Sequence, residues 1–250
     1  SGQQEVCERY LYGRDAAQFI KDIRRQRNRT ESPLSPGAVE IGELADGWQI
    51  APYDPNELLR CCRHIRLRSG YRLASYQLVS GGNGNGLTLV IPAGRRLPDP
   101  IDSDFEMEWD GLTPLLSMSG RSVPEWVRPD VDSFLEGDRS DSSYFEASIL
   151  LRELRELGAM WHGCDWSTHH LLVHPPSFVG PSWKWLQPAP SDWRPRIARH
   201  PDGRIETPFY TSSQHVTHRI VRHQDSYASD SYRVRMAPVT LAEGGPGYVF

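Results

Sequence analysis

The chain has 250 residues, with 28 Lys and Arg against 32 Asp and Glu, which gives a formal net charge of −4. This slightly acidic balance argues against a general nucleic-acid-binding surface, and the sequence has no apolar run of about eighteen residues that would span a membrane. Its 20 Pro, 21 Gly and 8 Trp are typical of a loop-rich domain rather than a helical bundle.

The cysteine pattern indicates the redox setting. The four cysteines are Cys7, Cys61, Cys62 and Cys164, and two of them are neighbours in sequence, which does not resemble a disulfide framework. We therefore expect a soluble protein in a reducing, cytoplasmic setting. At this length we expect a single domain over residues 1–250.

Residues 4–29 predict a first helix, with Phe19, Ile20 and Ile23 on one side and a strongly basic C-terminal end. We expect this helix to pack on the edge of a sheet with its cations on the surface. The alternative interpretation is an anion-binding or RNA-binding patch. No aromatic residues interleave the arginines to stack on bases, which argues against this alternative. A second, short helix is predicted from Asp54 to about His64.

Residues Tyr71–Val79 and Leu87–Ile91 predict two strands joined by the glycine-rich stretch Ser80–Gly86. A phosphate-binding loop needs a Lys and a following helix, and this stretch has neither. It therefore predicts a hairpin loop. The alternative is a place where backbone approaches a ligand closely, with Asn83 and Asn85 as ligand-binding residues.

An acidic stretch follows. From Asp102 to Asp110 the acids alternate with Phe105, Met107 and Trp109, which predicts a strand with one carboxylate face. A solvated edge strand explains this pattern; a Mg²⁺ or Mn²⁺ site is the alternative.

The clearest helix in the sequence spans residues 143–157. Its apolar residues recur at helical spacing and predict a buried stripe: Ile149, Leu150, Leu154 and Leu157. Its charged residues predict the opposite, solvent-facing side, including an Arg152–Glu156 pair: Arg152, Glu153, Arg155 and Glu156. Ser143 and Glu146 predict a capping box, and Gly158 predicts a left-handed helix end.

After Gly158 the period changes. Residues 159–162 and 168–173 predict two short paired strands with a turn at 163–167. On such a strand His169 and His170 point to opposite faces. The segment holds the densest cluster of chemically capable side chains in the chain: His162, Cys164, Asp165, His169, His170 and His174.

The second half predicts more strands. A turn at 200–204 joins strands 194–199 and 205–210, and 217–223 pairs with 231–236. Between 175 and 201 lie many prolines with Trp183, Trp185 and Trp193. These indoles either cap the core, which we favour, or bind a ligand by stacking.

Three functional classes follow from these residues. Ligand or partner binding through the Trp-, Pro- and Arg-rich loops is favoured weakly, with Trp183, Trp185 and Trp193 as contacts. A zinc-type hydrolase is the first alternative, with candidate ligands His162, Cys164, His170 and His218. A Cys–His nucleophilic enzyme is the second, although Cys164 follows a helix C-terminus, which disfavours its thiolate.

Taken together, the patterns predict an α+β fold with a mainly antiparallel, twisted sheet of about seven to nine strands and a few helices packed on it. No motif specifies a reaction. The candidate site is a pocket formed by His162, Cys164, Asp165 and His170, for which zinc is a possible cofactor. The ligand or protein partner stays undefined at this level.

Overall fold

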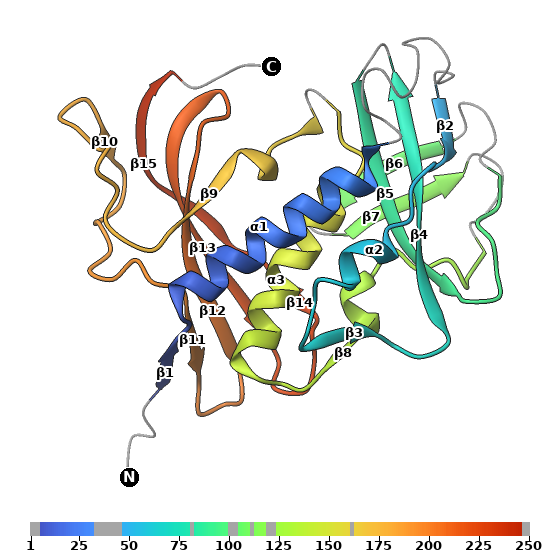
Figure 1. Cartoon of the computed structure of the whole chain (residues 1–250), viewed down its shortest axis with the longest axis horizontal. Coiled ribbons are helices and arrows are strands. Elements are labelled where there is room, and N and C mark those ends of the chain that lie inside the picture. Colours follow the sequence, from blue (N-terminus) through green and yellow to red (C-terminus); the bar gives the residue numbers. More distant parts are fainter. Residues whose placement is uncertain are drawn as a thin grey trace.

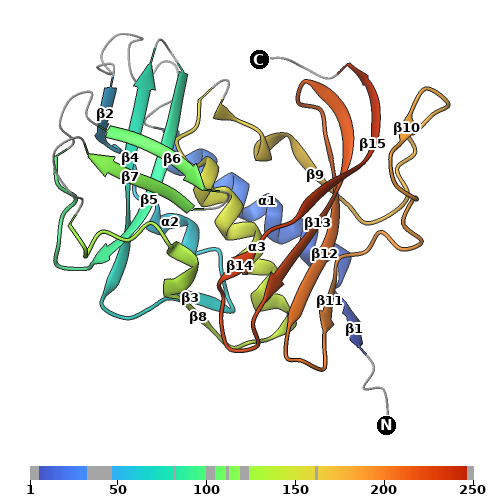
Figure 2. The same ribbon diagram turned by 180° about the vertical axis from the view of Figure 1, so that it is seen from behind.

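Helix α3 (Asp141–Glu156) lies at the centre of the fold, between a large sheet and a three-stranded sheet (Figure 1). The computed structural model describes residues 6–32, 47–80, 83–99, 105–110, 113–118, 124–160 and 163–246. α3 contacts β5 (Asn83–Pro92) in the smaller sheet and β12 (Ile205–Ser213) in the larger one. The view from behind shows the same layering (Figure 2). Helix α3 therefore packs between two β layers.

The other elements of the described residues complete these layers. The helices are α1 (Gly13–Thr30), α2 (Asn56–Leu59) and the short 3-10 helices η2 (Val131–Phe134) and η4 (Trp166–Thr168). The other strands before α3 are β1 (Cys7–Tyr10), β2 (Gly47–Ile50), β3 (Ile65–Leu67), β4 (Tyr71–Ser80), β6 (Phe105–Asp110), β7 (Thr113–Met118) and β8 (Leu135–Gly137). Those after it are β9 (His169–Leu172), β10 (Lys184–Trp185), β11 (Arg196–Arg199), β13 (Thr217–Tyr227), β14 (Val234–Arg235) and β15 (Pro238–Pro246).

The strands pair antiparallel throughout the described part of the chain, which confirms the predicted α+β class. The largest sheet has eight strands, within the predicted range, in the order β1–β11–β12–β13–β15–β10, with β14 on β13 and β9 on β12. Smaller sheets are β2–β4–β5, β3–β8 and β6–β7. The predicted pairing across the turn at 200–204 is confirmed. The predicted pairing of 217–223 with 231–236 is corrected: β14 pairs with Ser226 and Tyr227 at the end of β13, while residues 217–223 pair with β12 and β15.

The pairing after α3 differs from the predicted hairpin. β9 pairs with β12, so that His169 lies opposite Ser213, and Met160 instead forms a bridge with Gly84. Residues 161–162, in the first strand of the predicted hairpin, lie outside the described part. The long β12 offers β9 a partner remote in sequence, which a local pattern does not reveal.

The ends of α3 confirm one prediction and correct another. Gly158 has φ +83°, a left-handed conformation that glycine adopts without steric cost, as predicted. The N-cap, however, is Ser140, whose Oγ accepts from the N–H of Ser143. The predicted Ser143–Glu146 capping box is wrong, because Glu146 instead accepts the backbone N–H groups of Arg63 and His64.

The charged side of α3 is not a solvent face. Arg152, Glu153 and Glu156 are buried, although their spacing is that of an exposed helical surface. The predicted Arg152–Glu156 pair is replaced by a pair between Arg152 and Asp225 of β13. α3 is therefore buried on both sides, apolar residues on one and ion-paired residues on the other.

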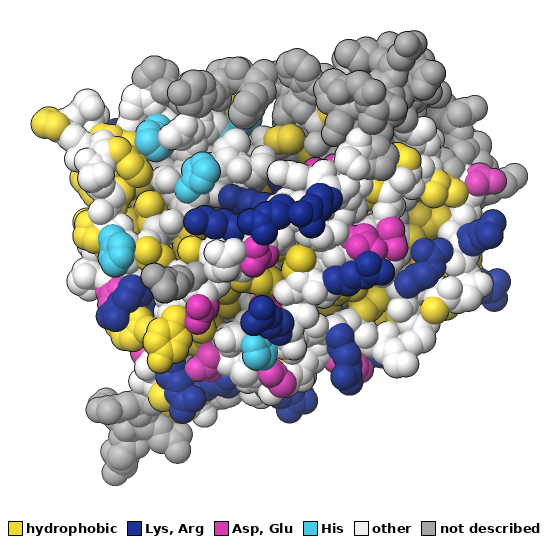
Figure 3. All heavy atoms as spheres, viewed as in Figure 1, with side chains coloured by type: hydrophobic (Ala, Val, Ile, Leu, Met, Phe, Trp, Pro, Cys, Tyr) yellow, Lys and Arg dark blue, Asp and Glu magenta, His cyan; other side chains and the backbone are white. Residues whose placement is uncertain are grey.

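Helix α1 begins later than predicted, because residues 7–10 form β1 at the edge of the large sheet. α1 packs against α3 and α2 and buries Ala16, Ile20 and Ile23. Its outward face carries a row of cations (Figure 3), among them the exposed Lys21, Arg25 and Arg29. Two other arginines turn inward: Arg24 Nε and Arg27 Nη1 donate to the buried Glu153 at 3.0 and 2.6 Å.

The glycine-rich stretch is part of the β4–β5 hairpin, as predicted, although the strands extend further than expected, with Ser80 opposite Asn83. Gly84 and Gly86 lie in β5 against the C-terminal end of α3, where Gly84 O accepts the N–H of Met160 at 2.8 Å. The close approach that glycine allows is therefore to the chain's own backbone. A strand forms at 105–110 as expected, while its carboxylate side chains lie outside the described ones.

No helix in the described ranges combines the length and the apolar composition needed to cross a bilayer.

Candidate functional site

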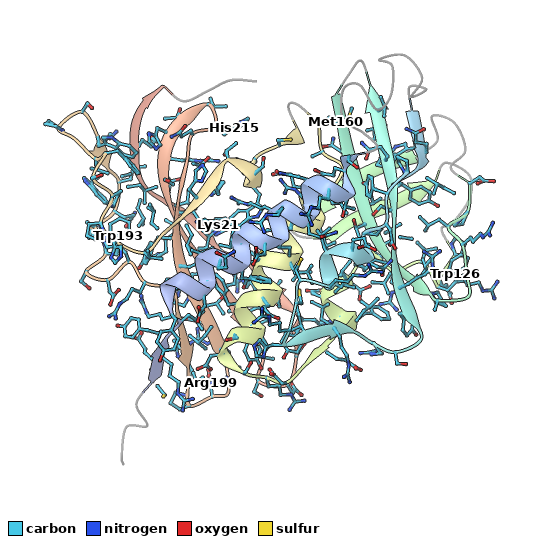
Figure 4. All side chains as sticks on the ribbon, in the orientation of Figure 1. Lys21, Trp126, Met160, Trp193, Arg199 and His215 are labelled. Carbon is cyan, nitrogen blue, oxygen red and sulfur yellow. The ribbon has the colours of Figure 1, made fainter. Side chains whose placement is uncertain are left out.

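A cavity of about 660 Å³ lies between the C-terminal half of α3, the loop after it, and strands β13 and β15. Figure 4 marks its surroundings, with Met160 beside the β4–β5 hairpin and His215 in the turn between β12 and β13. The lining residues come from six segments of the chain: Asn85, Arg152, Arg155, Glu156, Gly163, Asp165, Trp166, His169, Arg219, Val221, His223, Met236, Pro238 and Thr240.

Two of the lining histidines share one hydroxyl group. Thr211 Oγ1 lies 2.7 Å from His169 Nδ1 and 2.9 Å from His223 Nε2. The three residues come from the neighbouring strands β9, β12 and β13 and are all buried. Trp166 stacks on the His169 ring, with 5.3 Å between centroids. We call His169, Thr211 and His223 the histidine–threonine unit.

The direction of the hydrogen bonds in this unit follows from Arg152. A guanidinium only donates, so His223 Nδ1, which lies 3.2 Å from Arg152 Nη2, accepts. His223 then carries its proton on Nε2 and donates to Thr211. The Thr211 hydroxyl in turn donates to His169 Nδ1, which leaves the proton of neutral His169 on Nε2.

Arg152 is itself held by a buried carboxylate. Its Nη1 and Nη2 donate to the two oxygens of Asp225 at 2.5 and 2.8 Å, and the Asp225 side chain is 0% exposed. This bidentate geometry is the strongest form of the Arg–carboxylate pair. Burial, followed by the charge of Arg152, lowers the pKa of His223 well below its ordinary value, so His223 is neutral at neutral pH.

The open side of the cavity carries further charges. Arg219 Nη2 donates to Asp165 Oδ1 at 2.9 Å, and the same oxygen lies 3.8 Å from His169 Nε2. The N–H of His169, and then Arg219, lower the pKa of Asp165 against the opposing effect of burial. Burial, followed by the charge of Arg152, lowers the pKa of Arg155.

Two acids of α3 hold the loop that lines the cavity. Glu156 accepts the backbone N–H groups of Asp165 and Ser167 at 2.7 and 2.8 Å, and Glu153 accepts the indole N–H of Trp166 at 2.7 Å. Because buried carboxylates need such partners, these contacts hold the loop against the helix. They also explain why the charged side of α3 is buried.

The predicted pocket is only partly assembled at this cavity. Asp165 lines the cavity as predicted. His170 does not, and its neighbour His169 lines the cavity instead. Alternation along β9 turns the exposed His170 to the opposite face. Cys164 is not among the lining residues, and its Sγ donates to the Ala159 carbonyl. His162 lies outside the described residues.

Cys164 is poorly suited to nucleophilic chemistry. Burial, followed by the charge of Glu156, raises its pKa to about 11. We expect iodoacetamide at pH 7.5 to alkylate Cys164 on the order of 100-fold more slowly than an unperturbed thiol, because only the thiolate reacts. Mass spectrometry of timed digests measures this rate, with the exposed Cys7 as the internal reference. Alkylation of Cys164 as fast as that of Cys7 would contradict this assignment.

The other predicted binding residues lie elsewhere, with one exception. Trp193 is buried against Tyr210, and Trp183 packs with them in a side cluster. Tyr210 faces away from α3, and Figure 4 places Trp193 on that far side of the large sheet. Trp185 is partly exposed on β10. Asn85 lines the cavity, whereas the side chain of Asn83 lies outside the described ones.

The candidate zinc ligands do not form a group in the described part of the chain. His218 stacks on Phe178, with 4.7 Å between ring centroids, and is not among the residues that line the cavity. No three His, Cys, Asp or Glu side chains among the described residues are arranged to hold a metal ion. His162, a further predicted ligand, lies outside the described residues.

Sequence reasoning did not place Arg152, Arg155, Thr211, Arg219 or His223 in the site. A signal was present for two of them, Arg219 and His223. Arg219, His223 and Asp225 recur every second or fourth residue, which places them on one face of β13 together with Val221. No local pattern, however, indicates that this face is covered by α3.

No protein-family model matches the chain, and no solved structure matches it.

Proposed function

We propose that this protein binds a small organic anion in the cavity beside α3. The observation that carries the proposal is the convergence of three guanidinium groups on one cavity, Arg152 and Arg155 from α3 and Arg219 from β13. Guanidinium groups match carboxylate, sulfonate and phosphate oxygens in a planar, bidentate geometry.

The electrostatics of the wall support an anion. The charge of Arg152 acts on Arg155 at a partly buried position, where charge–charge interactions are screened less than in water. A bound anion would relieve this repulsion. The carboxylates nearby are engaged: Asp225 with Arg152, Asp165 with Arg219, and Glu156 with two backbone N–H groups.

The remaining wall supports an organic ligand rather than a bare inorganic ion. Trp166, Val221, Met236 and Pro238 supply an apolar side next to the arginines. Ligand pockets for small organic molecules range over roughly 300–1,000 Å³ and combine apolar walls with a few polar groups. The volume and the mixed lining of this cavity fall in that class.

This proposal keeps the binding class favoured by the sequence and moves the site from the Trp-rich loops to the cavity. The two enzymatic alternatives have less support. The raised pKa of Cys164 disfavours a thiolate nucleophile, and His170 and His218 do not line the cavity. The four free cysteines support the expectation of a reducing, cytoplasmic setting, which stays part of the proposal.

The test is isothermal titration calorimetry at pH 7 with benzenesulfonate and benzoate, and with benzamide as the neutral isostere. We expect both anions to bind and benzamide to bind at least tenfold more weakly. Arg219→Gln should weaken anion binding roughly tenfold, about 1.4 kcal/mol, because one charge-assisted contact is lost.

The matched control is Arg66→Gln, since Arg66 is an exposed arginine of β3 that does not line the cavity. Its affinity for both anions should equal that of the unmodified protein. Equal affinities for benzoate and benzamide, or an equal loss in the two variants, would contradict an anion site beside α3.

A further inference from the structure

We propose that the cavity takes up its anion together with one proton, and that His169 holds this proton. The inference rests on the proposed function, because it concerns the same cavity. It follows from the hydrogen-bond directions in the histidine–threonine unit. Only His169 Nδ1 can gain a proton there, because it faces a hydroxyl group that can become the acceptor.

His223 has no free position. Its Nε2 already carries a proton toward Thr211, and its Nδ1 faces the Nη2 of Arg152 at 3.2 Å. A proton added to this Nδ1 would point at a guanidinium N–H, two donors facing each other with no acceptor between them. Arg152 cannot turn away easily, because Asp225 holds it through two further hydrogen bonds. His223 therefore stays neutral.

His169 differs because its Nδ1 faces a hydroxyl. A Thr hydroxyl donates one hydrogen bond and accepts up to two. When a proton binds to His169 Nδ1, the Thr211 O–H rotates away and its oxygen accepts from both imidazoles, at the positions now 2.7 and 2.9 Å away. The Nε2–H of His169 continues to face Asp165. Protonation thus needs one hydroxyl rotation and breaks no ion pair.

Charged or titratable groups surround His169 from the elements packed against it: Arg152, Glu153, Arg155 and Glu156 of α3, Asp165 of the loop, Arg219, His223 and Asp225 of β13, His170 of β9, and Arg24 of α1, which donates to the His169 carbonyl. In the ligand-free protein, burial lowers the pKa of His169; Asp165 opposes this effect, and Arg219 and Arg152 add to it. An anion bound at the arginines cancels their repulsion of the imidazolium. Binding of the anion and of the proton therefore favour each other.

The sign of the pH dependence follows from this linkage. Burial lowers the pKa of His169 from its ordinary value, and an anion bound at the arginines would raise it. Between these two pKa values each bound anion brings one proton, so affinity increases up to about tenfold for each unit by which the pH falls. Above the higher value the affinity no longer depends on pH.

The experiment uses benzenesulfonate, which stays fully ionised at each pH tested. Its affinity is measured by calorimetry from pH 5 to 8, and the proton uptake is obtained from the binding enthalpy in two buffers of different ionisation enthalpy. For the unmodified protein we expect affinity to rise by up to tenfold per unit of falling pH, with uptake of up to one proton per ligand.

The variants locate the proton. His169→Asn, whose side-chain oxygen can still accept from Thr211, should lose the pH dependence of the affinity. Thr211→Val should also flatten it, because a protonated Nδ1 would lack an acceptor, and Thr211→Ser should restore it. Thermal unfolding shows whether each variant folds. If a variant does not fold, the measurement of proton uptake by the unmodified protein tests the inference.

The outcomes separate the two proposals. Binding at every pH without proton uptake overturns the proton inference and leaves the anion site standing. An unchanged pH dependence in His169→Asn places the proton elsewhere and also overturns the inference. Absence of binding at every pH overturns the anion site, and the proton inference with it.

Discussion

Replacing Asp225 with Asn will destabilise the protein by about 3–5 kcal/mol, because it leaves Arg152 as an uncompensated charge in the interior. Asp225 is fully buried, and its two oxygens accept from both terminal nitrogens of Arg152. The substitution keeps the shape of the side chain and removes the charge. Urea unfolding monitored by circular dichroism measures the free energy of unfolding.

The matched control is Asp192→Asn. Asp192 also pairs with an arginine, Arg194, through several short contacts, but that pair lies at the surface. Exposed ion pairs contribute little, so the stability of this variant should stay close to that of the unmodified protein. If Asp225→Asn and Asp192→Asn had the same small effect, the buried pair would not anchor α3 to β13.

Replacing Gly86 with Ala will have a comparably large effect, a loss of about 3 kcal/mol or more, because the added methyl group has no space. A Cβ at this position would overlap the carbonyl oxygen of Leu157 and approach the Tyr53 hydroxyl. Both belong to rigid surroundings, since Leu157 ends α3 and Tyr53 is buried. The β4–β5 hairpin would have to move away from the helix.

Gly94→Ala is the control for this change. Gly94 follows β5, and a Cβ built there meets no atom within 4 Å. Its substitution should leave the midpoint of urea unfolding nearly unchanged, or raise it slightly by restricting the unfolded chain. A tolerated Gly86→Ala would show that the helix end and the hairpin are packed less closely than described.

Several elements could be predicted because their signals are local. The apolar spacing of α3 and the left-handed Gly158 depend on residues within a few turns, and both are observed. The turn at 200–204 and the hairpin of β4 and β5 depend on turn chemistry between neighbouring strands. Such features are decided by backbone sterics and by the periodicity of side chains.

The candidate site depends on contacts between distant parts of the chain. The spacing of Arg152, Glu153 and Glu156 is the same on a solvated helix face and on one covered by arginines and a sheet. Only the partners distinguish the two, and Arg24, Arg27 and Asp225 are more than seventy residues away. Likewise, β9 could be recognised as extended from the sequence. Its pairing with β12 then determines that His169, and not His170, faces the cavity.

Local patterns were enough to predict the class of fold, the central helix and its end, and the histidine-rich segment after it. The burial of the charged face of α3, the histidine that faces the cavity, and the link from Thr211 to two imidazoles depend on long-range contacts of the folded chain. Backbone preferences act over a few residues. A buried charge or hydrogen bond, by contrast, requires a partner that folding can bring from any point in the chain.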